Sequence, residues 1–230
     1  MNAERRMQND RNPRARPTVV LLFCILHSVF CVSLPGCALL GVAANAVPQY
    51  TKAKYNGLQN QSIGVMVWAD RGVLIDWETI QIDLANAIQA KLETNKADEL
   101  KGAKFEWKPA SIVRYQRDHP GMEAQPITDV AARLPFTRLI YIEVESFRTR
   151  SETALELFRG SGVATLKIVE VDPITHAAKV GYSEENIQTV YPKKAPPDGI
   201  TSGNDQRIYI GAVQGLADEI VNRLVTHEDE

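Results

Sequence analysis

Cysteine is scarce in this chain, and its placement excludes several kinds of chemistry. The 230 residues include three cysteines, Cys24, Cys31 and Cys37, and all lie near the N-terminus. The long remainder of the chain contains none. A disulfide framework, a cysteine-rich zinc site and a cysteine nucleophile are therefore excluded for everything after Cys37.

Histidine is nearly as rare, and the sequence predicts no metal site. The four histidines are His27, His119, His176 and His227. None has a partner at the spacing of metal ligands, so we expect structural or exposed roles for them. The chain also lacks a phosphate-binding loop and a dinucleotide fingerprint. No cofactor is predicted.

An excess of positive charge is absent as well. The whole chain has 26 basic and 28 acidic side chains, a formal net charge of −2. The first 36 residues hold five of the basic and two of the acidic ones, which leaves 21 and 26 in the rest. That mildly acidic remainder excludes nucleic acid as the expected partner, because phosphate contacts need a concentrated basic surface.

Long apolar runs occur at one place only. Residues 18–33 are nearly all apolar and follow a polar, basic stretch, which is typical of a secretory signal. The run closes with Leu34-Pro35-Gly36-Cys37, which resembles the lipobox of bacterial lipoproteins. The resemblance implies that a signal peptidase recognises Leu34 and Gly36. It also implies that Cys37 is lipidated and becomes the first residue of the mature protein.

Two alternatives for this segment stay open. Ala44-Asn45-Ala46 is an A-x-A pattern, and cleavage after Ala46 would release a soluble exported protein. An uncleaved anchor from Thr18 to Leu40 is the other. Its apolar run is marginal for the ~20 residues that span a bilayer.

The sequence after Cys37 predicts a tether and then one domain. Residues 45–61 contain Pro48, Gly57 and several amides without a sustained period, so they are interpreted as linker. We therefore expect a signal peptide over 1–36, a lipidated N-terminus and tether over 37–61, and a single domain over 62–230.

Periodicity predicts the elements of that domain. We expect strands at 63–68, 105–107, 137–150, 162–171 and 179–191, and helices at 77–94, from Pro109, near 128–134, and at 205–226. Asp76 is the expected cap of the first helix. The last helix has an apolar stripe repeating every four residues. Residues 227–230 are expected to be a frayed acidic tail.

This order, βα(β)ααβββα, predicts an α+β fold. The last three strands are adjacent in sequence and should form an antiparallel meander. One mixed sheet with helices packed on one face would accommodate all the elements.

The predicted domain also has a family resemblance. The helix Asp129-Val130-Ala131-Ala132-Arg133-Leu134 leads into the strand Leu139-Ile140-Tyr141-Ile142-Glu143-Val144. This resembles small envelope domains: activator lipoproteins of penicillin-binding proteins, the curli secretion lipoprotein, and the N-terminal domain of the Tol–Pal translocation protein. The usual glycine between helix and strand is Pro135 here. The resemblance implies protein binding in the envelope, and it carries over no functional residue except Cys37.

Few residues suggest catalysis. Glu143 and Glu145 share one face of a strand, but alternating charges are ordinary on the outer face of a sheet. Ser161 lies between two glycines without the strand-to-helix context of a nucleophile elbow. No catalytic residue is predicted, and the chain is expected not to be an enzyme.

A cluster of basic and apolar residues marks a candidate partner surface. The basic members are Arg148, Arg150, Arg159, Lys193 and Lys194, and they could bind an acidic partner or a cell-wall polymer, or form a solvated rim. The apolar members are Leu155, Leu157 and Phe158. If exposed, they form a partner patch. If they extend the strands, they belong to the core.

The sequence thus favours a lipid-anchored cell-envelope protein with a protein-binding domain. Its expected location is the periplasmic face of the outer membrane, with the inner membrane as the alternative. An envelope protein is the expected partner, and an oligomer is a further option. The alternatives are a periplasmic enzyme or cell-wall binder, and a soluble exported protein.

Overall fold

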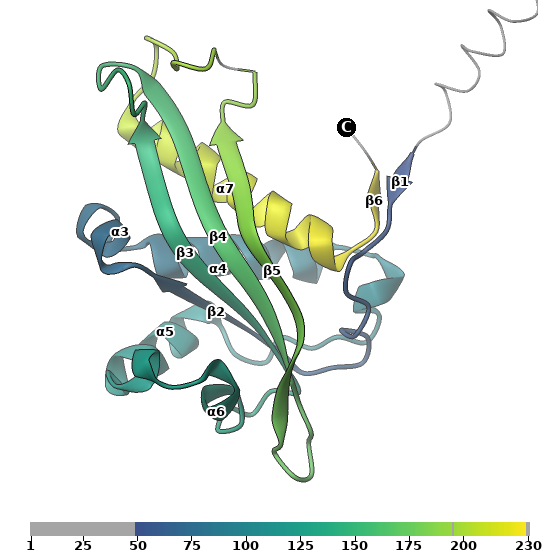
Figure 1. Cartoon of the computed structure of the whole chain (residues 1–230). Coiled ribbons are helices and arrows are strands. Elements are labelled where there is room, and N and C mark those ends of the chain that lie inside the picture. Colours follow the sequence, from purple (N-terminus) through teal and green to yellow (C-terminus); the bar gives the residue numbers. More distant parts are fainter. Residues whose placement is uncertain (1–48, 195, 229–230) are drawn as a thin grey trace, which may run out of the picture. The chain divides into compact units, whose positions relative to one another are not determined.

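A four-stranded mixed sheet organises this computed structural model, which describes residues 49–194 and 196–228 (Figure 1). The strand order is β2-β3-β4-β5. The bounds are β2 Ile63–Ala69, β3 Arg138–Arg150, β4 Phe158–Val171 and β5 Ala178–Tyr191. The last three strands pair antiparallel, and β2 pairs parallel to β3. The predicted α+β class and the predicted meander are confirmed.

The connection between the parallel strands carries most of the helices, because parallel strands cannot be joined by a tight turn. Its elements are α3 Arg71–Asp76, α4 Ile80–Thr94, the 3₁₀ helix η1 Asp98–Leu100, α5 Pro109–Asp118, the 3₁₀ helix η2 Met122–Ala124 and α6 Ile127–Ala131. The chain then enters β3 beside β2, with Ile63 opposite Arg138.

The larger core lies between one face of the sheet and the two long helices, α4 and α7 (Asp205–Leu224). Ile140, Ile142 and Val144 of β3 point into it and are buried, as their alternation predicts. From α7, Leu216 and other residues of the four-residue repeat pack there. Both elements bury the face that their apolar period defines.

The opposite face of the sheet is also covered, which corrects the expectation of helices on one face only. Met66 and Leu139 form a second core with Ile112 of α5 and Val130 of α6. The apolar run of β2 explains this, because a strand buried on both faces has little polar alternation. A short apolar run does not by itself reveal how many faces are covered.

The second core stops partway along the meander. Figure 1 shows β3, β4 and β5 continuing past α5 and α6, while α7 stays behind them. On the side away from α7, this part of the sheet carries polar and charged side chains such as Ser146 and Arg148. An antiparallel sheet tolerates one solvated face.

The N-terminal part of the domain differs from the predicted tether. Tyr55 and Leu58 are buried in the larger core, and Leu58 has an exposed fraction of 0%. The two-residue strand β1 (Tyr50–Thr51) pairs with β6 (His227–Glu228). The tether expected over 37–61 therefore does not extend to Gln61, and residues 227–228 are paired rather than frayed.

Two smaller expectations are also wrong. Phe105 to Trp107 do not form a strand, and only the adjacent Lys104 makes an isolated bridge, to Ser62. Asp76 ends α3 instead of capping the next helix, which begins at Ile80. Trp77 lies in the link between α3 and α4 and stacks on Tyr209 of α7, so it does not begin a helix.

Candidate functional site

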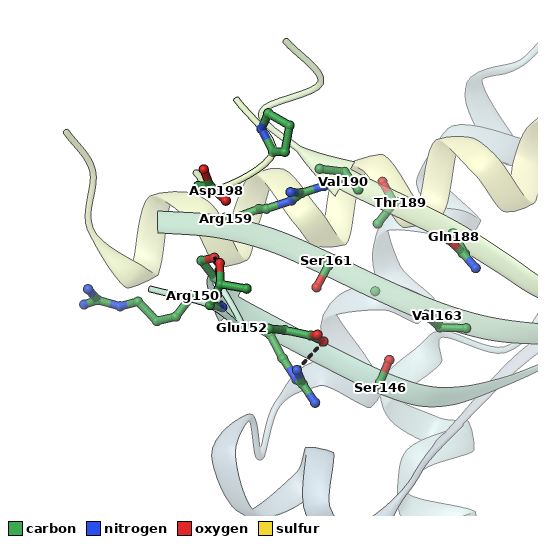
Figure 2. Close-up of a pocket in the computed structure, with 15 residues that line it drawn as sticks. Ser146, Arg150, Glu152, Arg159, Ser161, Val163, Gln188, Thr189, Val190 and Asp198 are labelled. Atoms are coloured by element: carbon green, nitrogen blue, oxygen red, sulfur yellow. Dashed lines mark hydrogen bonds and ion pairs between the residues drawn. The ribbon is translucent and has the colours of Figure 1, made fainter. Parts of the chain in front are cut away.

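Two hollows lie at the end of β3, around the connection to β4. One lies on the solvated face of the meander, has a volume of about 490 Å³, and is called the sheet hollow (Figure 2). The other has a volume of about 560 Å³, is bordered by Trp77 and Phe147, and is called the aromatic hollow. Arg148, Arg150 and the start of the β3–β4 connection line both.

Strand register builds the floor of the sheet hollow. One cross-strand row consists of Arg148, Ser161 and Val190, and the next consists of Ser146, Val163 and Gln188. Directly opposed residues of antiparallel strands share a face, so each row presents its side chains together. Phe147 and Thr189, which alternate with them, are buried on the α7 side. The floor is therefore mostly hydroxyl, amide and guanidinium groups.

The cations of the sheet hollow differ in how they are paired. Arg148 forms an exposed ion pair with Glu152, drawn as a dashed line in Figure 2. Arg159 is half-buried on β4, and within the described part of the chain its side chain has no ion pair or hydrogen bond. Asp198 also lines the hollow, but no ion pair joins it to Arg159, so the Arg159 guanidinium has no direct counter-charge.

Arg150 is committed to a structural role. Its Nε and Nη2 atoms donate to Asp205 Oδ1 and Oδ2 at 2.8 and 2.7 Å, and its guanidinium lies 3.9 Å from the ring centroid of Phe158. Thr149 Oγ1 also donates to Asp205, at 2.7 Å. The hydrogen bonds from Arg150 and then Thr149 hold the pKa of Asp205 below its usual range. This bidentate pair joins the end of β3 to the first turn of α7.

An aromatic cluster forms one wall of the aromatic hollow. The Trp77 ring stacks on Tyr209 with centroids 4.8 Å apart, and Phe147 meets Trp77 edge-on at 6.0 Å. The Tyr209 hydroxyl donates to Asp83 Oδ2 at 2.7 Å, and burial raises its pKa. Leu155, from the β3–β4 connection, is 74% exposed on the rim. The hollow thus combines fixed aromatic rings with an uncovered apolar side chain.

The structure brings most of the predicted surface residues together. Arg148, Arg150, Leu155 and Arg159 line one or both hollows, and Phe158 lies under Arg150. Of the predicted apolar residues, Leu155 is exposed. Leu157 and Phe158 are half-buried, and Phe158 begins β4.

Other predicted residues lie elsewhere. Lys193 lines a separate hollow with Lys54 and Asp218, and Lys194 is exposed in the same loop as Lys193. The loop after β5 does reach the sheet hollow, but through Pro197 and Asp198, so the two lysines are not placed with the arginines. Leu34, Gly36 and Cys37 lie outside the described residues.

Several lining residues were not predicted. Ser146, Glu152 and Gln188 contribute to the sheet hollow, and Trp77 contributes to the aromatic hollow. Alternation with Arg148 could have identified Ser146. No local signal identifies Gln188, because its place follows from the register between β4 and β5.

The two glutamates weighed as an acid–base pair bind their sheet neighbours. Glu143 lies 3.9 Å from Lys167 Nζ, and Glu145 accepts a hydrogen bond of 2.7 Å from Thr165. This confirms that they belong to the outer face of the sheet. Between Gln49 and Glu228, leaving out residue 195, no three His, Cys, Asp or Glu side chains are placed to share a metal ion.

Near the other end of the sheet, a polar network links Tyr55, Glu170 and Arg138 by hydrogen bonds. Tyr55 Oη donates to Glu170 Oε1 at 2.8 Å and accepts from Arg138 Nε at 3.0 Å. Burial, and then the bond to Glu170, raise the pKa of Tyr55 to about 12. The bond from Tyr55, with help from Lys179 and Arg138, lowers the pKa of Glu170. This network ties the N-terminal segment to the sheet.

Comparison with known proteins does not assign the chain to a family. No family model and no curated protein matches the chain. Ten solved chains match in structure. One is the hypothetical protein CT253 from Chlamydia trachomatis, with 18% identity, TM-score 0.42, and coverage of 75% of this chain and 95% of that one.

PelC from Paraburkholderia phytofirmans is similar as well, in two dodecamer structures. Both are 11% identical and cover 78% of this chain, with TM-scores of 0.35 and 0.36 and coverage of 98% and 97% of PelC. With TM-scores below 0.5, neither likeness supports a statement about function. In the described residues, no helix has the length and apolar character that a membrane span requires.

Proposed function

We propose that this chain is a lipid-anchored protein of the cell envelope whose α+β domain binds another protein and catalyses no reaction. The aromatic hollow supports this best, because Leu155 is exposed beside the half-buried Trp77. Apolar and aromatic groups surrounded by charged residues are the usual anatomy of a protein interface.

The geometry suits an anchor residue of a partner. The stack between Trp77 and Tyr209 and the hydrogen bond from Tyr209 to Asp83 fix the wall before binding. A rigid wall loses little entropy on association, so binding energy concentrates there. A partner side chain that covered Leu155 would remove its apolar surface from water.

The location rests on the N-terminal sequence. A diacylglyceryl group on the Cys37 sulfur would supply the two chains that stable anchoring needs. Ala38 rather than an aspartate follows the cysteine, which by resemblance to enteric lipoproteins favours the outer membrane. The inner membrane and the soluble form cleaved after Ala46 are the alternatives.

The intact mass of the membrane-extracted protein tests the anchor. The proposal expects a chain that begins at Cys37 with added lipid mass, and a Cys37→Ser variant that is not processed in this way. A chain starting at Met1 or Val47 without lipid would contradict it.

Site-specific photo-crosslinking in cells tests the binding role. A benzoylphenylalanine in place of Leu155 should capture a discrete envelope protein. The same group in place of Ile174 is the matched control, because Ile174 is 87% exposed but lies in the β4–β5 turn. Identical products from both positions, or none from position 155, would refute the proposed surface.

A second candidate is a binder of cell-wall polymer. The sheet hollow favours it, because Arg159 and the hydroxyls of Ser146 and Ser161 converge on one open surface. A pocket with convergent polar groups is a default ligand site. Retention of the protein on purified cell wall, lost on Arg159→Gln, would support this candidate over the first.

A further inference from the structure

Arg159 is the unusual group of the sheet hollow. Figure 2 shows its side chain extending from β4 toward Val190. It is half-buried, yet no described carboxylate lies within ion-pair distance. Partial burial of a guanidinium without a counter-charge costs free energy, and a bound anion would offset that cost.

Arg148 supplies a second cation, and its present partner is weakly held. Arg148 and Glu152 are 53% and 72% exposed, and Glu152 belongs to the β3–β4 connection rather than to a strand. Exposed ion pairs of this kind contribute little to stability. A carboxylate from outside could therefore replace Glu152 at Arg148 at small cost.

The remaining lining indicates the chemistry of the ligand. Ser146 and Ser161 offer hydroxyl donors, and no aromatic ring lines the sheet hollow. Val163 and Val190 alternate with these polar groups in the cross-strand rows. Guanidinium and hydroxyl donors on an open strand surface fit a polypeptide segment that carries several carboxylates.

We propose that the sheet hollow binds an acidic segment of the partner protein, with one carboxylate on Arg159 and a second on Arg148. Glu152 is an internal substitute for the second carboxylate and leaves Arg148 when the segment binds. This inference rests on the proposed protein-binding function. The two hollows share Arg148 and Glu152, so a partner anchored beside Trp77 would continue across them.

Fluorescence anisotropy with the full chain in detergent tests the proposal, using a fluorescein-labelled hexaglutamate peptide at low salt. Arg159→Gln should weaken binding about tenfold, as expected for loss of a charge-assisted hydrogen bond. Glu152→Gln should tighten binding by up to about fivefold, because it removes the competitor. Arg114→Gln is the matched control, since Arg114 is an exposed arginine on α5, and it should bind like the parent.

Competitors distinguish the sources of the anion. Inorganic phosphate and oligogalacturonate, a carboxylated glycan, should both compete poorly with the peptide. Preferential binding of the glycan would overturn the proposal in favour of a polymer ligand. Equal losses for Arg159→Gln and Arg114→Gln would also overturn it, since binding would then depend on overall charge.

Failure of this proposal can be separated from failure of the proposed function. If crosslinking from position 155 captures a partner and Arg159→Gln leaves hexaglutamate binding unchanged, the acidic segment is wrong and the protein-binding role stands. If hexaglutamate binds through Arg159 but position 155 captures nothing, the anion site stands without the proposed partner surface.

Discussion

Replacing Leu58 with alanine tests whether the chain before Ser62 belongs to the domain. Leu58 is fully buried and packs in the larger core. Truncation of a fully buried leucine costs about 2–5 kcal/mol, because it removes apolar contacts and leaves a cavity. For a domain of this size, 1 kcal/mol shifts Tm by about 2–4 °C. A loss of about 3 kcal/mol therefore lowers Tm by about 6–12 °C.

Thermal unfolding of the full chain, followed by circular dichroism, measures this effect. Leu155→Ala is the matched control, because it is the same substitution at a position that is 74% exposed. Surface substitutions usually stay within about 0.5 kcal/mol. If both variants melt within about 2 °C of the parent, Leu58 is not a core residue and the segment is a tether after all.

Three further predictions use the same melting assay. Gly64→Ala should destabilise the protein by about 1–3 kcal/mol, because the new Cβ would lie 2.4 Å from Cε2 of the buried Phe136 ring. A second substitution, Phe136→Leu, should recover part of the lost stability. Glu170→Gln should lower Tm at pH 7, because the folded-state pKa of Glu170 is lowered from 4.5 and its carboxylate therefore stabilises the fold above pH 4.5. This stabilisation is lost as the pH falls through the lowered pKa, so a Tm deficit that persisted in acid would contradict the prediction. Asn204→Ala should lower the free energy of unfolding by about 0.5–2 kcal/mol. Asn204 Oδ1 accepts a hydrogen bond of 2.8 Å from the backbone N–H of Arg207 and so caps the start of α7, a cap that Asn204→Asp should keep.

The partner surface was only partly predictable. Arg148, Arg150 and Arg159 flank one connection in the sequence, and they do gather at one end of the sheet. Their different roles were not visible, because Arg150 is paired with Asp205, more than fifty residues away along the chain. Whether a cation is free or paired depends on such distant contacts.

The sequence alone determined the elements with a long, regular period. The alternation of Ile140, Ile142 and Val144 specified β3 and its inward face, and the four-residue repeat from Ile208 to Leu224 specified α7. These signals are local, because side-chain direction within a strand or helix follows from backbone geometry alone.

Tertiary structure decided what touches these elements. It buried Tyr55 and Leu58, placed α5 and α6 on the second face of the sheet, and left the far end of that face open to solvent. It also left Phe105 to Trp107 without a strand. Short apolar runs gain their free energy from whichever surface they meet, so their place depends on residues distant in the chain.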